Sequence, residues 1–168
     1  MKKVFHAVLM AGLLAVVFSS CKSSKSAQAA TAKSEKKSVK GTWVLNNISF
    51  EGVPKTARIT TVFNNIPYKC LEGSVWTLPN ATANGTYAIT SGETGCSPVT
   101  QNIVWSTYDR DGIVYFQFKE LLSGVKAKNT PDGYRVELTS VDNNSMTWRA
   151  PVNIDGQTAY INYSLSRR

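Results

Sequence analysis

The feature that most limits the fold is a series of short runs, from Gly41 onward, in which apolar and polar residues alternate. In three of these runs the apolar residues of one face are Val114, Phe116 and Phe118; Tyr134, Val136 and Leu138; and Ile161, Tyr163 and Leu165. Successive side chains of a β-strand point to opposite faces of a sheet, so a period of two predicts half-buried strands. This part of the chain has no helical period, and we therefore predict an all-β domain.

Turn-forming residues divide the same region into eight or nine expected strands. The candidate segments are 43–50, 58–63, 74–78, 85–90, 99–108, 113–119, 134–141, 145–152 and 157–166. Consecutive strands joined by tight turns favour an up-and-down meander, and closing the meander removes its exposed edges. We predict an eight-stranded antiparallel up-and-down β-barrel, with an irregular loop or short helix over 67–73.

An immunoglobulin-like sandwich is the competing all-β fold, because Cys70, Trp76 and Cys96 superficially match its cysteine pair and buried tryptophan. The two cysteines are only 26 residues apart, however, and the tryptophan follows the first by six. This spacing is too short for the bridge between the two sheets of a sandwich. The barrel is therefore the favoured interpretation.

The first 21 residues have the layout of an export signal. Lys2 and Lys3 give a positive start, residues 7–18 are apolar, and two serines precede Cys21. This order is typical of a secretory signal peptide, and the apolar run is too short to span a bilayer core of roughly 30 Å. A cysteine directly after small residues resembles the lipobox of bacterial lipoproteins, in which it is diacylated and begins the mature protein. The alternative is an ordinary secreted protein with a spare thiol.

The positive charge of the mature chain lies mostly in a segment before the β-rich domain. Residues 22–40 contain six lysines and one glutamate, whereas the chain from Gly41 onward contains 11 basic and 10 acidic residues. A segment this polar cannot bury enough apolar surface to fold. We therefore expect residues 22–40 to form a flexible tether that spans roughly 20–25 Å. A nucleic-acid-binding protein carries its basic surface on the folded domain, and we expect no nucleic-acid partner here. The expected organisation is a signal peptide at 1–20, the lipidated cysteine and linker at 21–40, and the barrel at 41–168.

Cys70 and Cys96 are the two cysteines beyond the signal region. An even pair in an exported protein predicts a disulfide, which stabilises a loop of this length by about 3–4 kcal/mol. The only histidine of the chain, His6, lies in the signal peptide. A metal site is therefore the poorer interpretation of the two cysteines, and we expect neither a metal nor a cofactor.

Few residues of the mature chain suit catalysis. Without a histidine it cannot run a serine or cysteine mechanism of the triad type. Glu72, Glu120 and Glu137 are candidate members of a carboxylate pair for glycoside hydrolysis, but no spacing selects two of them. We expect a protein that is not an enzyme.

Gly41-Thr42-Trp43, at the start of the first expected strand, is similar to the G-x-W motif that opens lipocalin barrels. In that family the tryptophan closes one end of the barrel, and an arginine from the end of the last strand packs across it. Arg167 or Arg168 stands in the corresponding place, where a cation–π contact contributes about 0.5–2 kcal/mol. The resemblance implies that the glycine, the tryptophan and these arginines are structural residues of one barrel end.

The motifs together resemble the small lipocalin-like lipoproteins of Gram-negative bacteria. They are the lipobox, the polar linker, G-x-W, the run from Cys70 to Trp76, a hairpin at 84–87 and Cys96. The resemblance implies an outer-membrane protein that is anchored through a lipid on Cys21 and faces the periplasm or the cell surface. Lys22-Ser23-Ser24 carries no acidic retention signal, which by analogy favours the outer membrane.

Aromatic residues on the apolar strand faces indicate binding. Trp76, Phe116, Phe118 and Trp148 are the candidates for lining a ligand cavity. An eight-stranded barrel is either filled by such side chains or holds one small ligand, and bulky residues at most inward positions favour filling. We expect a membrane-anchored binding module for a small apolar ligand in the cell envelope. The alternative is a solid-core barrel that acts as a protein-interaction or structural subunit, or as an inhibitor, in an envelope complex.

Overall fold

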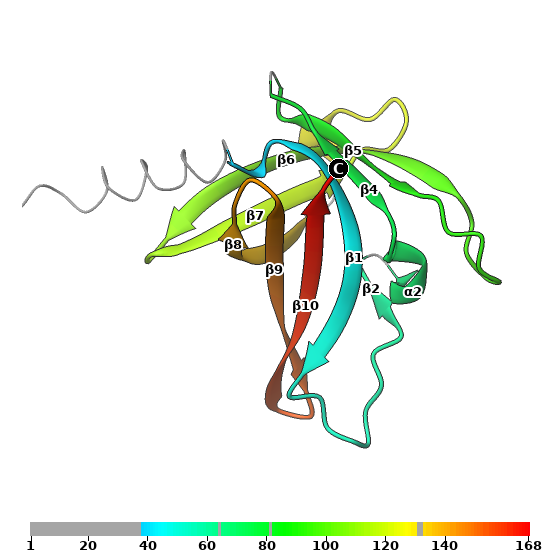
Figure 1. Cartoon of the computed structure of the whole chain (residues 1–168), viewed down its shortest axis with the longest axis vertical. Helices are drawn as coiled ribbons and strands as arrows, with labels where there is room; N and C mark the ends of the chain where they lie inside the picture. Colours follow the sequence, from blue (N-terminus) through cyan, green and yellow to red (C-terminus); the bar gives the residue numbers. More distant parts are fainter. Residues whose placement is uncertain (1–37, 64, 81, 131–132) are drawn as a thin grey trace, which may run out of the picture.

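The computed structural model describes residues 38–63, 65–80, 82–130 and 133–168 (Figure 1). The signal peptide, Cys21 and the linker up to residue 37 lie outside these ranges, so the predictions for them stay predictions. Within the described part of the chain, no helix has the length and apolar composition needed to cross a membrane.

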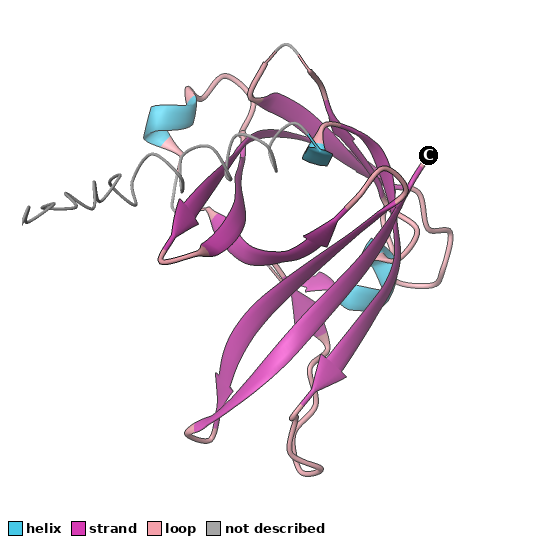
Figure 2. Ribbon diagram, turned by 60° about the vertical axis from the view of Figure 1, so that its left-hand side comes forward, coloured by secondary structure: helices cyan, strands magenta, loops and turns pink. Residues whose placement is uncertain are grey.

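Eight antiparallel strands close into a barrel, which confirms the predicted fold class (Figures 1 and 2). The strands are β1 (Gly41–Glu51), β4 (Val75–Leu78), β5 (Asn84–Ile89), β6 (Val99–Arg110), β7 (Ile113–Glu120), β8 (Tyr134–Val141), β9 (Ser145–Ile154) and β10 (Gln157–Arg167). They follow one another around the wall in chain order from β4 to β10, and β1 pairs with both β10 and β4. Each strand of the wall therefore has two hydrogen-bonded neighbours.

The chain between β1 and β4, residues 52–74, is called the insertion below. The prediction of a long strand at 58–63 is wrong: β2 (Thr61–Val62) and β3 (Ile66–Pro67) pair only with each other. Phe63 and Asn65 have positive φ angles of 32° and 63°, which turn the chain back directly after β2. The helix α2 (Tyr68–Leu71) then lies in the stretch where the sequence predicts a loop or short helix. One further helical turn, η1 (Ala127–Asn129), lies between β7 and β8.

The two ends of the barrel differ. At the end that we call the closed end, β1 begins opposite Leu78, and Trp43 lies opposite Arg167 near the C-terminus. The β4–β5, β6–β7 and β8–β9 connections lie at this end, because the strands alternate in direction. The insertion and the β5–β6, β7–β8 and β9–β10 connections lie at the opposite end, which we call the loop end.

Inward side chains form one core that is rich in aromatic rings. All four tryptophans of the chain belong to it, and none is more than 2% exposed. The alternation breaks where the register shifts, between Leu45 and Asn47 in β1 and between Leu138 and Ser140 in β8. In β1 the next buried residue after Leu45 is Ile48, three positions on, because a bulge adds one residue to one strand of a pair.

The packed part of the chain begins before Gly41. Val39 is fully buried, and its carbonyl accepts a hydrogen bond of 2.7 Å from Nε1 of Trp43. The valine is the one branched apolar residue of the expected linker, and it lies against the tryptophan of the G-x-W motif. Residues 38–40 therefore belong to the folded domain rather than to the tether.

Candidate functional site

The middle of the barrel is filled by the four aromatic residues that the sequence singles out as ligand-lining candidates. The rings of Trp76 and Trp148 lie 5.0 Å apart, and the ring of Phe118 lies 5.2 Å from Trp76. Phe116 stacks on Trp148 at 4.8 Å. These are the separations of aromatic rings in contact. The four residues thus face one another in a packed layer.

One polar atom of this layer stands out. Nε1 of Trp148 is buried and has no hydrogen-bond acceptor among the described residues. The ring of Trp76 stands at 84° to that of Trp148 on one side. A buried donor without an acceptor lowers the stability of the fold by roughly 1–3 kcal/mol. An acceptor that reached this N–H inside the barrel would remove that cost.

Phe63, which comes from the insertion and not from the barrel wall, is half-buried and packs against the core toward the loop end. Its ring stacks on Tyr163 at 5.2 Å and 10°, and the ring of Phe118 stands edge-on to it at 5.2 Å and 84°. Tyr134 at 5.1 Å and Trp76 at 6.5 Å complete its surroundings. We call the space bounded by these four neighbours the Phe63 seat. It is a place between barrel side chains that a group from outside the wall occupies.

Sequence reasoning misses this role of Phe63 and assigns the residue to the end of a strand. Its ring partners lie between 13 and 100 residues further along the chain, beyond the reach of any local pattern. The available signal is a bulky aromatic residue directly before Asn64-Asn65, in a turn where small and polar residues are usual.

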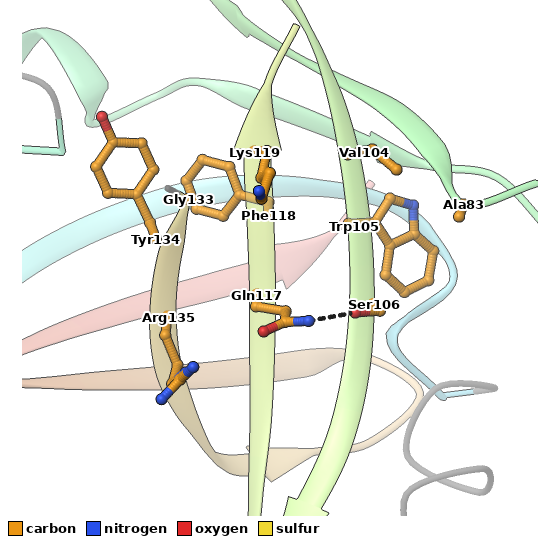
Figure 3. A pocket seen from close by; sticks show the side chains of 10 residues that line it. All are labelled: Ala83, Val104, Trp105, Ser106, Gln117, Phe118, Lys119, Gly133, Tyr134 and Arg135. Atoms are coloured by element: carbon orange, nitrogen blue, oxygen red, sulfur yellow. Dashed lines mark hydrogen bonds between the residues drawn. The ribbon is translucent and has the colours of Figure 1, made fainter. Parts of the chain in front are cut away.

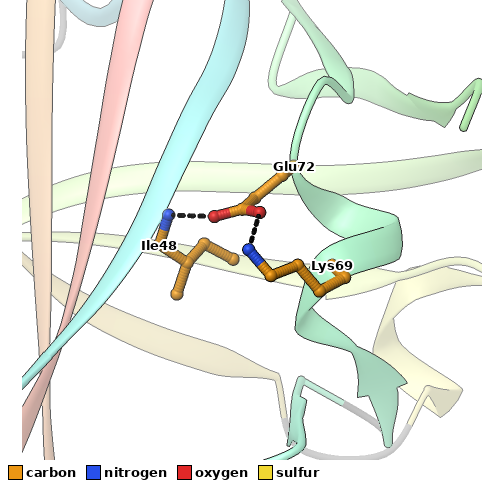
Figure 4. A network of polar contacts seen from close by, with 3 residues as sticks. All are labelled: Ile48, Lys69 and Glu72. Atoms are coloured by element: carbon orange, nitrogen blue, oxygen red, sulfur yellow. Dashed lines mark hydrogen bonds and ion pairs between the residues drawn. The ribbon is translucent and has the colours of Figure 1, made fainter.

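The insertion is fixed to the barrel through its C-terminal part. The Glu72 carboxylate accepts hydrogen bonds from the backbone N–H of Ile48 on β1 at 2.8 Å and from Nζ of Lys69 at 2.9 Å (Figure 4). The same carboxylate raises the pKa of the Lys69 ammonium group above its usual value. Cys70 is bonded to Cys96 in the β5–β6 connection, with 5.3 Å between the Cα atoms, which confirms the predicted disulfide. The helix α2 is therefore tied both to β1 and to the neighbouring connection.

The three glutamates considered for glycoside chemistry lie on three different segments. Glu72 holds α2 against β1, as described above. Glu120, at the end of β7, accepts a hydrogen bond of 2.5 Å from the hydroxyl of Tyr87. Burial, together with this hydrogen bond, raises the pKa of Tyr87 well above its usual range. Glu137 lies on β8 opposite Arg149 of β9. Two of the three carboxylates thus have partners with a structural role.

At the closed end, Arg167 packs across Trp43. Its guanidinium carbon lies 4.3 Å from the centroid of the indole ring. The guanidinium group also donates hydrogen bonds to the backbone carbonyls of Lys40 at 2.9 Å and Ser38 at 3.0 Å. Arg168 instead donates its backbone N–H to β1 at 2.9 Å. Of the two arginines that the resemblance places at this end, Arg167 makes the cation–π contact.

Gly41 leaves the room that this arginine needs. The glycine has a φ of +138°, and a Cβ atom there would collide with Nη1 of Arg167. A larger residue would strain the backbone and displace the guanidinium group. The glycine of the G-x-W triplet thus allows Arg167 to pack across Trp43 in this chain.

A hollow of about 460 Å³ lies on the outer wall over β6, β7 and β8 (Figure 3). At its centre, Nε2 of Gln117 donates a hydrogen bond of 2.9 Å to the hydroxyl oxygen of Ser106. Lys119 and Arg135 bring two positive charges to it, and neither forms an ion pair with another described residue. Arg135 also lies over the ring of Tyr108, 5.4 Å from its centroid. Strand alternation predicts outward side chains here but not the hollow, because its lining combines residues from β6, β7 and β8.

Comparisons with protein-family models, with curated proteins and with solved structures found no match to this chain. The functional argument therefore rests on the motifs of the chain and on the geometry of its barrel. Three features bear on it: the aromatic interior, the Phe63 seat and the outer-wall hollow.

Proposed function

We propose that the protein is a lipocalin-like lipoprotein, anchored in the outer membrane through Cys21, whose barrel binds a small apolar ligand. The observation that carries this proposal is the Phe63 seat. There the barrel accommodates an apolar group that does not belong to its wall, between Phe118 and Tyr163. A barrel that takes one such group from the insertion has the size and the chemistry to take one from a ligand.

The composition of the interior supports an apolar ligand with few polar groups. Binding sites for small molecules are lined mostly by apolar and aromatic side chains with a small number of polar groups that fix orientation. The seat and the layer below it consist of aromatic rings. Nε1 of Trp148, which has no acceptor in the described part of the chain, is one polar group in that layer. A ligand acceptor that reached this donor would remove the cost of its burial.

Burial of one ring sets the scale of the affinity. An aromatic group buries about 150–250 Å², which contributes about 4–6 kcal/mol at roughly 25 cal/mol per Å². The loss of translational and rotational freedom offsets much of this gain. We therefore expect weak binding for a single ring and tighter binding for a ligand that extends beyond the seat.

Native mass spectrometry of the complete protein, purified from the bacterial envelope, tests this proposal. We expect acyl groups on Cys21 and a noncovalent small-molecule adduct that is lost on heating. A variant with Cys21→Ser, purified from the same cells, separates ligand in the barrel from lipid on the anchor. A barrel that is empty in both proteins, isolated with a protein in a fixed ratio, would contradict the proposal.

The second candidate is a protein-interaction or structural subunit of an envelope complex. The observation that favours it is the combination of a filled barrel middle with the outer-wall hollow, where Lys119 and Arg135 have no ion-pair partner among the described residues. An acidic surface on a partner protein would complement these two charges. Arg135→Glu should then abolish chemical crosslinking to the partner. Arg58→Glu, a change at an exposed position of the insertion, should leave the crosslinked complex unchanged.

A further inference from the structure

The geometry points to Phe63 as an internal occupant of the binding site, and to a ligand whose flat aromatic ring enters by taking its place. This inference rests on the proposed binding function and specifies its ligand class and its mode of entry.

The shape of the seat selects a flat ring. Tyr163 lies nearly parallel to the ring of Phe63, at 10°, whereas Phe118 stands nearly perpendicular to it, at 84°. Stacked and edge-on contacts of this kind use both the negative face and the positive edge of an aromatic group. An alkyl chain has neither, so it would lose both contacts while filling the same space. The ligand part that fits the seat is an aromatic ring about the size of a phenyl group.

The backbone of Phe63 is held in a conformation that bulky residues rarely adopt. Its φ angle is +32°, in a region that glycine and asparagine tolerate and that costs free energy for a phenylalanine. Such a conformation persists only when the surrounding contacts outweigh its cost, and it is a recognised feature of ligand clamps and switches. A ring that replaces Phe63 in the seat would let this strained backbone relax.

The attachment of the insertion allows this exchange. The backbone hydrogen bonds recorded for its first part run within the insertion itself: Ala57 to Pro54, Ile66 to Phe63, and Tyr68 to Thr60. The ladder between β2 and β3 has only two residues per strand. The helix α2, in contrast, is held by the disulfide and by Glu72. Side-chain packing, that of Phe63 and of the buried Val62 beside it, is thus what holds the hairpin in the mouth of the barrel. A ligand that takes the place of Phe63 has to release this packing, while α2 stays in place.

The test uses the complete mature chain, residues 21–168, with Cys21→Ser so that it carries no acyl groups, and fluorobenzene as the probe. Binding is followed by fluorine NMR of the probe. Movement of the hairpin is followed by the rate of trypsin cleavage after Lys55 and Arg58, both of which are exposed. Cleavage after Lys126 and Lys128, which are exposed between β7 and β8, serves as the internal control.

We expect saturating fluorobenzene to accelerate cleavage at the two insertion sites at least threefold and to leave the control sites unchanged. Phe63→Ala should bind the probe at least ten times more tightly than the wild-type chain, because the internal competitor is gone. Phe50→Ala is the matched control: its ring contacts Tyr68 at 5.1 Å and is not part of the seat, so it should bind like the wild type. An excess of 1-octanol should not displace the probe.

The wild-type chain alone tests the displacement of Phe63. If it binds fluorobenzene without faster cleavage at the insertion sites, the claim that the probe displaces Phe63 is wrong. Displacement of the probe by 1-octanol, or a natural ligand that contains only alkyl chains, would overturn the aromatic class while leaving a binding function in place. Absence of probe binding to the wild type and to Phe63→Ala would overturn the inference, and the mass spectrum of the native protein then decides the function separately. If Phe63→Ala does not fold, Phe63→Leu replaces it in the test, because leucine keeps an apolar group but has no ring. Phe63→Leu should bind the probe more tightly than the wild type, and equal binding would contradict the inference.

Discussion

Replacing Arg167 with alanine removes the group that closes the barrel over Trp43. The cation–π contact at 4.3 Å contributes about 0.5–2 kcal/mol. The guanidinium group also donates hydrogen bonds to the backbone carbonyls of Lys40, Ser38 and Asn143. Such bonds from a charged donor contribute about 1.5–3 kcal/mol each when buried, but these carbonyls are part-buried or exposed and regain water, so we assign the three together about 1–2 kcal/mol. The free energy of unfolding should therefore fall by about 1.5–4 kcal/mol.

The assay is urea unfolding of the oxidised mature chain, followed by tryptophan fluorescence, with thermal unfolding as a second measurement. At about 3–5 °C per kcal/mol for a domain of this size, the expected loss lowers Tm by roughly 5–20 °C. Arg167→Lys keeps the charge but not the planar fork, so it should lose about half as much stability.

The matched control for this prediction is Arg168→Ala. Arg168 is exposed and contacts β1 through its backbone, so removal of its side chain should change stability by less than about 0.5 kcal/mol. Equal losses for the two alanine variants, or no loss for Arg167→Ala, would refute the account of the closed end.

Three further predictions concern the disulfide, the buried tyrosines and Glu72. Replacing Cys70 and Cys96 together with serine should lower the free energy of unfolding by about 3–4 kcal/mol in urea titrations, and equal stability would contradict a native bridge. Burial raises the pKa of Tyr87 and Tyr163, so the neutral phenols stabilise the fold below about pH 10 and this stabilisation is lost as the pH rises further. Absorbance titration should show both phenols ionising only with alkaline unfolding; ionisation in the folded protein near pH 10 would refute their burial. Glu72→Gln keeps an acceptor for the β1 amide and should cost less than about 0.5 kcal/mol, whereas Glu72→Ala should cost about 1–3 kcal/mol; similar losses in urea unfolding would contradict the role of that hydrogen bond.

The barrel strands could be predicted because their information is local. Each strand of the wall has one face in the core, so its alternation appears in the sequence itself, and β8 has the predicted bounds of 134–141. The exceptions arise where the pairing between strands shifts. A bulge in β1 moves the next buried position after Leu45 from Asn47 to Ile48, a change that depends on the pairing partner and not on the residues of β1 alone.

The insertion could not be predicted in the same way, because tertiary contacts decide its course. Residues 58–63 are rich in β-forming side chains, yet only Thr61 and Val62 form a strand there. The closed barrel leaves these residues no free edge, and Phe63 gains ring contacts inside it with partners such as Tyr163, one hundred residues away. The β-propensity of a residue describes how well it fits a sheet that it can join. Here the barrel is closed, so residues 58–63 have no sheet edge to pair with.

The candidate residues divide along the same line. The four ligand-lining candidates do point into the barrel, as alternation predicts, but whether they fill it depends on how the rings from facing walls meet. Val39 stands among the polar residues of the expected linker in the sequence and is nevertheless buried. It packs at the closed end, where its carbonyl accepts the hydrogen bond from Nε1 of Trp43. The lining of the outer-wall hollow likewise comes from three strands, which no short stretch of sequence contains.

A crystal structure of the mature chain soaked with fluorobenzene tests the central claim, that the barrel binds an apolar ring at the Phe63 seat, most directly. We predict density for the probe between the rings of Tyr163 and Phe118, with the side chain of Phe63 outside the seat. Phe63 in place, with the probe bound only elsewhere, for example in the outer-wall hollow over β6, β7 and β8, would contradict it.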